Sequence, residues 1–234
     1  MLGRAQEATL PWGQTRSLPT IQIYNQIASE VLNWFPISDM AEYSVRLNER
    51  RAPFYRELGE YAESVRQFTH AIDDCMLYVH DFTVLVTLYR NRAHVWAVQG
   101  REREWRLDIE RAVAAASRVP DADRAKLEGL ILYSEAEGYK RLANVADRPT
   151  RQRAHAEAAL HCFAQARAQT VSESEAHHVL LDVSESQAYL WLDADESARL
   201  ARAARNRAQF SYPSLNSKIE VTLAQAAERV RRLH

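Results

Sequence analysis

Four histidines lie close together in the sequence, and their side chains are of a type that binds zinc. His155 and His161 are six residues apart, so one helix would not place both on one face. His177 and His178 are adjacent and diverge on a helix, and Cys162 is the nearby thiol. No HExxH or CxxC pattern accompanies them. We interpret these histidines as surface or core residues and predict no metal site.

The sequence also lacks the motifs that accompany a catalytic nucleophile. Cys75 and Cys162 both fall inside predicted helices, with no glycine-rich elbow beside them. Neither a GxSxG motif nor a phosphate-binding GxxxxGK motif occurs, and only 6 glycines are available for an active-site loop. We therefore predict a protein that is not an enzyme and that holds no cofactor.

Charge and composition limit the kinds of partner and the cell compartment that we expect. The formal net charge of the 234-residue chain is -1, which does not indicate binding to nucleic acid or to an anionic membrane. The first residues contain no apolar signal segment, and the longest nearly apolar run, residues 82–89, is too short to span a bilayer. Two cysteines within helices fit a reducing compartment better than a disulfide scaffold. The sequence predicts a soluble, cytoplasmic protein.

Helical periodicity extends along almost the whole chain, and strand-like alternation is absent from the sequence. We expect an irregular tail over residues 1–19 and one all-α domain over 20–234, built as a superhelical stack of antiparallel helix hairpins. Residues 143–150 are the one longish loop that we expect inside the array. The predicted helices, about ten, cover residues 20–35, 39–58, 61–79, 82–99, 102–117, 121–142, 151–169, 174–192, 194–209 and 215–233.

A repeated pairing of small and large residues indicates how these helices pack. The first helix of each hairpin carries a small residue followed three positions later by an aromatic one. The second helix carries a large residue followed three positions later by alanine, except in the last repeat, where both positions are alanine. The small residue lets two helices approach closely, and the large one fills the space toward the next hairpin. The pairs are Ala52/Tyr55, Ala93/Trp96, Ala136/Tyr139 and Ser186/Tyr189 on first helices, and Phe68/Ala71, Ile109/Ala112, Phe163/Ala166 and Ala201/Ala204 on second helices.

This pattern resembles the tetratricopeptide repeat. Gly59, Glu60 and Tyr61 match the family's turn between helices, while Phe68 and Ala71 match its second helix. The repeats are longer than the family's spacing of about 34 residues, because the small residues of successive first helices lie 41, 43 and 50 positions apart. Such long repeats are similar to those fused to bacterial helix-turn-helix regulators, where the array senses a peptide or a protein. No helix-turn-helix segment is visible in this sequence.

The resemblance implies a binding face. In tetratricopeptide arrays the first helices line a concave surface. Arginine and asparagine side chains of this chain that point there would hold a peptide carboxylate or backbone. We expect a protein or peptide ligand, and the lead interpretation is the effector-binding part of a bacterial transcription regulator. A scaffold without a regulatory ligand, a helical enzyme or metalloprotein, and a homodimer stay open as alternatives, as does a merely solvated charged face. The expected peptide-binding residues are Arg46, Glu49, Arg50, Arg90, Asn91, His94, Tyr133, Glu137, Lys140 and Gln187.

Overall fold

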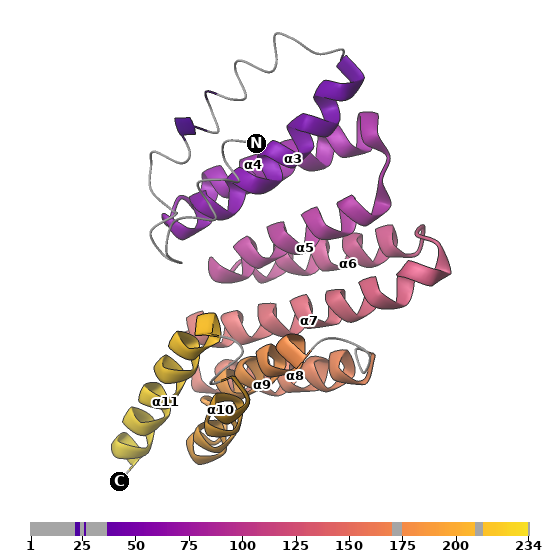
Figure 1. Ribbon diagram of the computed structural model, residues 1–234. Coiled ribbons are helices and arrows are strands. Elements are labelled where there is room, and N and C mark those ends of the chain that lie inside the picture. The colour runs from indigo at the N-terminus through magenta and orange to yellow at the C-terminus, as the bar shows by residue number, and fades with distance from the viewer. Residues whose placement is uncertain (1–21, 24–25, 27–36, 170–174, 209–212, 234) are drawn as a thin grey trace. The chain divides into compact units, whose positions relative to one another are not determined.

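A computed structural model describes residues 22–23, 26, 37–169, 175–208 and 213–233 of the chain (Figure 1). These residues form nine α-helices and one π-helical turn, and they contain no strand. The prediction of an all-α fold is confirmed. None of the described helices combines the length and the apolarity that crossing a bilayer requires. The predicted tail over 1–19 and most of the predicted helix over 20–35 lie outside the described residues.

Contacts group the described residues into two compact units. Unit 1 holds the residues up to Val95 together with Leu107–Val119, and unit 2 holds Trp96–Arg106 together with Pro120 and all later residues. The boundary therefore falls within two helices, α5 (Phe82–Val98) and α6 (Glu102–Ala116). A single domain over 20–234, and its superhelical arrangement, stay predictions.

The first hairpin of unit 1 turns where the sequence predicts. Helix α3 (Ile37–Glu57) and helix α4 (Tyr61–Asp74) pack against each other (Figure 1). Gly59 between them has a φ of 80°, a left-handed conformation that a residue without Cβ adopts at little cost. The buried hydroxyl of Ser64 donates a hydrogen bond of 2.7 Å to the carbonyl of Ala52, which holds the two helices close together.

A π-helical turn, η1 (Cys75–Val79), follows α4 directly and ends at His80, whose φ of 54° is also left-handed. Cys75 is buried, whereas Met76, Leu77 and Tyr78 are exposed. The next helix then starts at a side-chain cap, because the Asp81 carboxylate accepts hydrogen bonds from two backbone amides of α5.

The core of unit 1 follows the predicted small-residue pattern. Ala52, Ala71, Ala93 and Ala112 are essentially inaccessible to solvent, as is Phe68. A buried ion pair that the sequence does not reveal accompanies them. The Arg92 guanidinium donates two hydrogen bonds of 2.8 Å to the Asp108 carboxylate, and a third of 2.9 Å to the Thr69 hydroxyl. These contacts connect α4, α5 and α6 within unit 1.

Unit 2 contains five long helices. They are α7 (Asp121–Val145), α8 (Pro149–Gln169), α9 (Glu175–Tyr189), α10 (Ala194–Ala208) and α11 (Pro213–Leu233) (Figure 1). Each packs against the next as far as α11, and α9 also contacts α7 and α11. The loop predicted over 143–150 is wrong, since α7 runs through Val145 and α8 already begins at Pro149. Proline is well tolerated at the first position of a helix, because its missing N–H would have no partner there.

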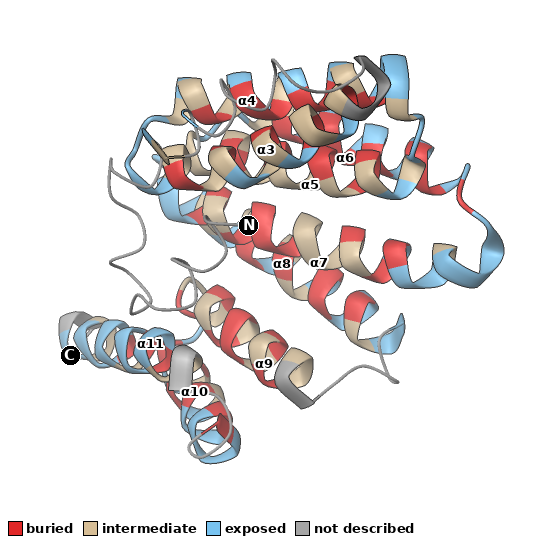
Figure 2. Cartoon of the chain, turned by 45° about the horizontal axis from the view of Figure 1, so that its top comes forward, coloured by how far each residue is buried: buried red, intermediate tan, exposed pale blue. Residues whose placement is uncertain are grey.

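Buried residues gather on the facing sides of these helices (Figure 2). One cluster in unit 2 contains Ala136, Phe163 and Leu181, and a second contains Val183, Ala204 and Ile219. Between them, the two clusters draw members from all five helices of unit 2.

A glycine on α7 makes room for a tryptophan within unit 2. A Cβ added to Gly138 would lie 2.1 Å from Nε1 of Trp105 and 2.5 Å from its Cε2, which is closer than any real Cβ contact. The Trp105 side chain is fully buried and packs edge-on against Tyr139, with ring centroids 4.7 Å apart. Gly138 thus serves close packing on α7.

We predict that Gly138→Ala lowers the free energy of unfolding by about 1–3 kcal/mol, because the added methyl overpacks a filled core. Urea denaturation would measure the change. In a Trp105→Leu background the same substitution should cost little, since the indole that the methyl meets is gone. An equal cost in both backgrounds would contradict this account.

Candidate functional site

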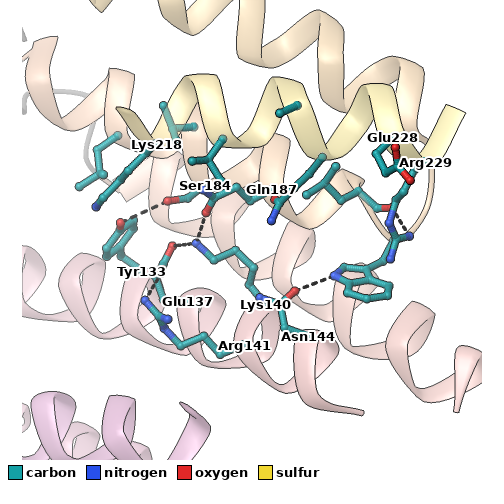
Figure 3. A pocket seen from close by; sticks show the side chains of 17 residues that line it. Tyr133, Glu137, Lys140, Arg141, Asn144, Ser184, Gln187, Lys218, Glu228 and Arg229 are labelled. Atoms are coloured by element: carbon teal, nitrogen blue, oxygen red, sulfur yellow. Dashed lines mark hydrogen bonds and ion pairs between the residues drawn. The ribbon is translucent and has the colours of Figure 1, made fainter. Parts of the chain in front are cut away.

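A hollow of about 860 Å³ lies within unit 2, a size typical of ligand-binding pockets. Its lining comes from α7, α9 and α11, together with two residues just after α9 (Figure 3). Neither α8 nor α10 contributes a lining residue. The lining residues are Tyr133, Glu137, Lys140, Arg141, Asn144, Leu180, Val183, Ser184, Gln187, Leu190, Trp191, Lys218, Val221, Ala224, Gln225, Glu228 and Arg229.

Four of the ten predicted binding residues line this hollow: Tyr133, Glu137, Lys140 and Gln187. The other six belong to unit 1 and do not line it. They lie on α3 and α5, and are Arg46, Glu49, Arg50, Arg90, Asn91 and His94. The structure therefore brings together the predicted residues of α7 and α9, and it leaves the peptide-binding role of all ten a prediction.

The three lining helices run in the same direction, as the contacts between them show. Later residues of α7 contact later residues of α9 or of the segment just after it. The same holds for α9 and α11. The contacts, in order, are Tyr133 with Ser184, Lys140 with Gln187, and Asn144 with Trp191, then Gln187 with Thr222 and Leu190 with Arg229.

A buried ion pair occupies the middle of the hollow (Figure 3). The Lys140 ammonium donates a hydrogen bond of 2.6 Å to the Glu137 carboxylate and one of 2.7 Å to the side-chain oxygen of Gln187. The Gln187 amide in turn donates to the Thr222 hydroxyl at 3.2 Å. Only 7% of the Lys140 side chain and 10% of the Glu137 side chain are exposed. This chain of contacts joins α7, α9 and α11.

Electrostatics keep this pair charged. Burial by itself would raise the pKa of Glu137, but the charges of Lys140 and Arg141 and hydrogen bonds from Lys140 and Ser184 lower that pKa to about 2. Burial lowers the pKa of Lys140 from its usual 10.5, and the Glu137 carboxylate opposes this change. At neutral pH the carboxylate is ionised and the ammonium has the partner that a buried charge requires.

The two ends of the hollow differ in character. At one end Lys218 of α11 points toward Tyr133 of α7, whose hydroxyl lies 3.4 Å from that of Ser184 (Figure 3). At the other end the Trp191 indole donates a hydrogen bond of 2.8 Å to Asn144, and the Arg229 guanidinium lies 3.8 Å from the centre of the Trp191 ring. The first end therefore carries an exposed cation, and the second carries a cation–π pair.

Apolar side chains also line the hollow, and we call them the apolar strip. Leu180 and Val183 of α9 contribute to it, and so do Val221 and Ala224 of α11. Val221 is 55% exposed although it is a large apolar side chain in the middle of a helix. Exposed apolar surface of this kind, beside convergent polar groups, is typical of a site that covers part of its ligand.

The described residues offer little for covalent or metal chemistry. The Cys75 and Cys162 thiols are buried, and burial raises the pKa of Cys162 to about 12, far from the range of a nucleophile. In the described part of the chain no three histidine, cysteine or acidic side chains are grouped to hold a metal ion. What the hollow offers is hydrogen bonds, charge and apolar contact.

The sequence prediction missed the contribution of α11. None of the ten residues that it names lies on this helix. Ile219 and Ala226 of α11 are fully buried. The neighbouring stripe carries the lining residues Lys218, Val221 and Gln225, which recur at a spacing of three or four. That spacing was visible in the sequence, but only the position of α9 shows that the stripe faces a hollow.

We predict that Glu137→Gln lowers the free energy of unfolding by about 3–5 kcal/mol at pH 7, because it leaves the Lys140 ammonium buried without a carboxylate. The pKa of Glu137 is lower in the folded chain than the usual 4.5, so its ionisation stabilises the fold above about pH 4.5. That contribution disappears as the pH falls from about 4.5 toward 2. Denaturation at a series of pH values should show the variant and the parent converging in this window. A constant difference at all pH values would contradict the prediction.

We compared the sequence with family models and with curated proteins. No protein-family model matches the chain, and no curated protein is significantly similar to it. The resemblance to tetratricopeptide repeats therefore stays a prediction.

Proposed function

We propose that this chain is a binding module and that the hollow of unit 2 receives a short extended segment of a peptide or partner protein. One observation carries the proposal: three helices that run in the same direction surround an apolar strip with side chains that can hydrogen-bond a peptide backbone. Recognition, without a covalent step, is the mechanism.

Two lining amides have hydrogen-bonding capacity to spare. The Asn144 side chain uses its oxygen to accept from Trp191, and its NH₂ group makes no hydrogen bond within the described residues. The exposed Gln225 side chain has no hydrogen-bond partner among the same residues. A carboxamide offers both a donor and an acceptor, which is the pairing that an extended peptide backbone requires. The Gln187 amide, by contrast, is engaged by Lys140 and Thr222.

The apolar strip supplies the second part of recognition. A ligand side chain placed on Val221 would cover surface that is now exposed to water, which stabilises the complex by about 25 cal/mol per Å². Backbone hydrogen bonds with one or two apolar anchors are a recurring mode of peptide recognition.

The wider proposal is that binding serves regulation in the cytoplasm, as the effector-binding part of a bacterial transcription regulator. The similarity of the long repeats to those of such regulators supports it. The two buried, unpaired thiols, Cys75 and Cys162, support a reducing compartment.

Selection of displayed random peptides on the immobilised full chain tests the proposal. We expect the selection to yield peptides that bind the parent chain. The Val221→Gln variant should bind them about tenfold less tightly, because an apolar side chain of the peptide would lose roughly 1.4 kcal/mol of binding free energy. Titration calorimetry would measure both affinities. The matched control is Ala227→Gln, at another exposed position of α11 that does not line the hollow, and it should leave affinity unchanged.

Two results would contradict the proposal. One is the absence of any enriched peptide after selection on the parent chain. The other is an equal loss of affinity in the Val221→Gln and Ala227→Gln variants, which would place the contact outside the hollow.

A further inference from the structure

The lining of the hollow is rich in cations although the chain as a whole is not. Four basic side chains line it against two acidic ones, while the formal net charge of the chain is -1. The chain has only three lysines, Lys126, Lys140 and Lys218, and the last two lie in this lining. Positive charge is thus concentrated where a ligand would lie.

The two lining carboxylates do not balance this charge at the Lys218 end. Glu137 is fully engaged, because Lys140 lies at 2.6 Å, Arg141 at 3.6 Å, and Ser184 also donates to it. Glu228 pairs with Arg231 at 3.6 Å and lies beside Arg229 at the opposite end (Figure 3). No carboxylate of the described residues is within ion-pair distance of the Lys218 ammonium.

Donors around the buried ion pair outnumber their acceptors. An ammonium carries three N–H donors, and the structure gives that of Lys140 only two acceptors within the described residues, on Glu137 and Gln187. Nε of Arg141 is buried and has no hydrogen-bond partner. A buried donor without an acceptor destabilises a protein, so a ligand oxygen that reaches these groups would gain from them.

We propose that the ligand of this hollow is an anionic peptide whose oxyanion lies between Lys218 and Lys140. This inference rests on the proposed peptide-binding function. An oxyanion presents two or more acceptor oxygens, so it can take the remaining Lys140 donor and the Lys218 ammonium together. The Tyr133 hydroxyl lies at the same end of the hollow. Burial lowers the pKa of Lys140 most, and the positive charges of Arg141 and Lys218 lower it further, so an anion between the two lysines would relieve the repulsion between them.

The same chemistry can come from a C-terminal carboxylate, an acidic side chain or a phosphoryl group, and the experiment separates these sources. Pools of short random peptides are passed over the immobilised full chain. In one pool both termini are blocked and no residue is acidic. The other pools each add one feature: a free C-terminal carboxylate, internal Asp and Glu, or phosphoserine. Mass spectrometry counts the retained peptides.

We expect at least one anionic pool to be retained about tenfold more than the neutral pool, as loss of a charge-assisted hydrogen bond implies. Lys218→Gln and high salt should each abolish this preference. Lys126→Gln is the matched control. It removes another exposed lysine of unit 2 that does not line the hollow, and the preference should survive it.

The outcomes separate the two claims. Equal retention of neutral and anionic pools by the parent chain, with Val221→Gln weakening both, would overturn the oxyanion inference and leave peptide binding intact. A preference that Lys218→Gln and Lys126→Gln reduce equally would also overturn it. If no pool is retained by the parent more than by Val221→Gln, the proposed function itself fails.

Discussion

The burial of a lysine ammonium is the constraint on which unit 2 depends. Lys140 could not be buried as a charge unless Glu137 stood one helical turn away and Gln187 faced it from α9. Because Gln187 also binds Thr222, the requirement of one cation fixes the spacing of three helices. The hollow exists between those helices, so its geometry follows from the same requirement.

Small side chains let the helices of unit 2 pack closely at other positions. Ala136 and Ser186 are fully buried on α7 and α9, and Gly138 admits the Trp105 indole. Close approach of backbones brings short polar side chains within hydrogen-bonding distance across helices. The polar contacts between the helices that line the hollow and the apolar clusters of unit 2 therefore depend on the same close packing of helices.

Local patterns made much of this fold predictable. The turn at Gly59 and the small buried residues at Ala52 and Ala93 follow from periodicity and turn chemistry, which short stretches of sequence carry. The buried ion pair of Lys140 with Glu137 and the place of Lys218 in the lining could not be predicted, because a charged residue on a helix normally faces water and only tertiary contacts reveal an exception. Four of the ten predicted site residues, all on α7 and α9, line one hollow, and the repeat pattern from which they were projected stays a prediction.

The scarcity of lysine has a consequence for covalent labelling. Amine-directed reagents find three side-chain targets in this protein, and one of them, Lys140, is shielded by burial. Lys126 and Lys218 remain accessible, one outside the hollow and one in its wall. A ligand bound as proposed would cover Lys218 and leave Lys126 open, so the ratio of modification at these two positions would report how much of the protein is occupied.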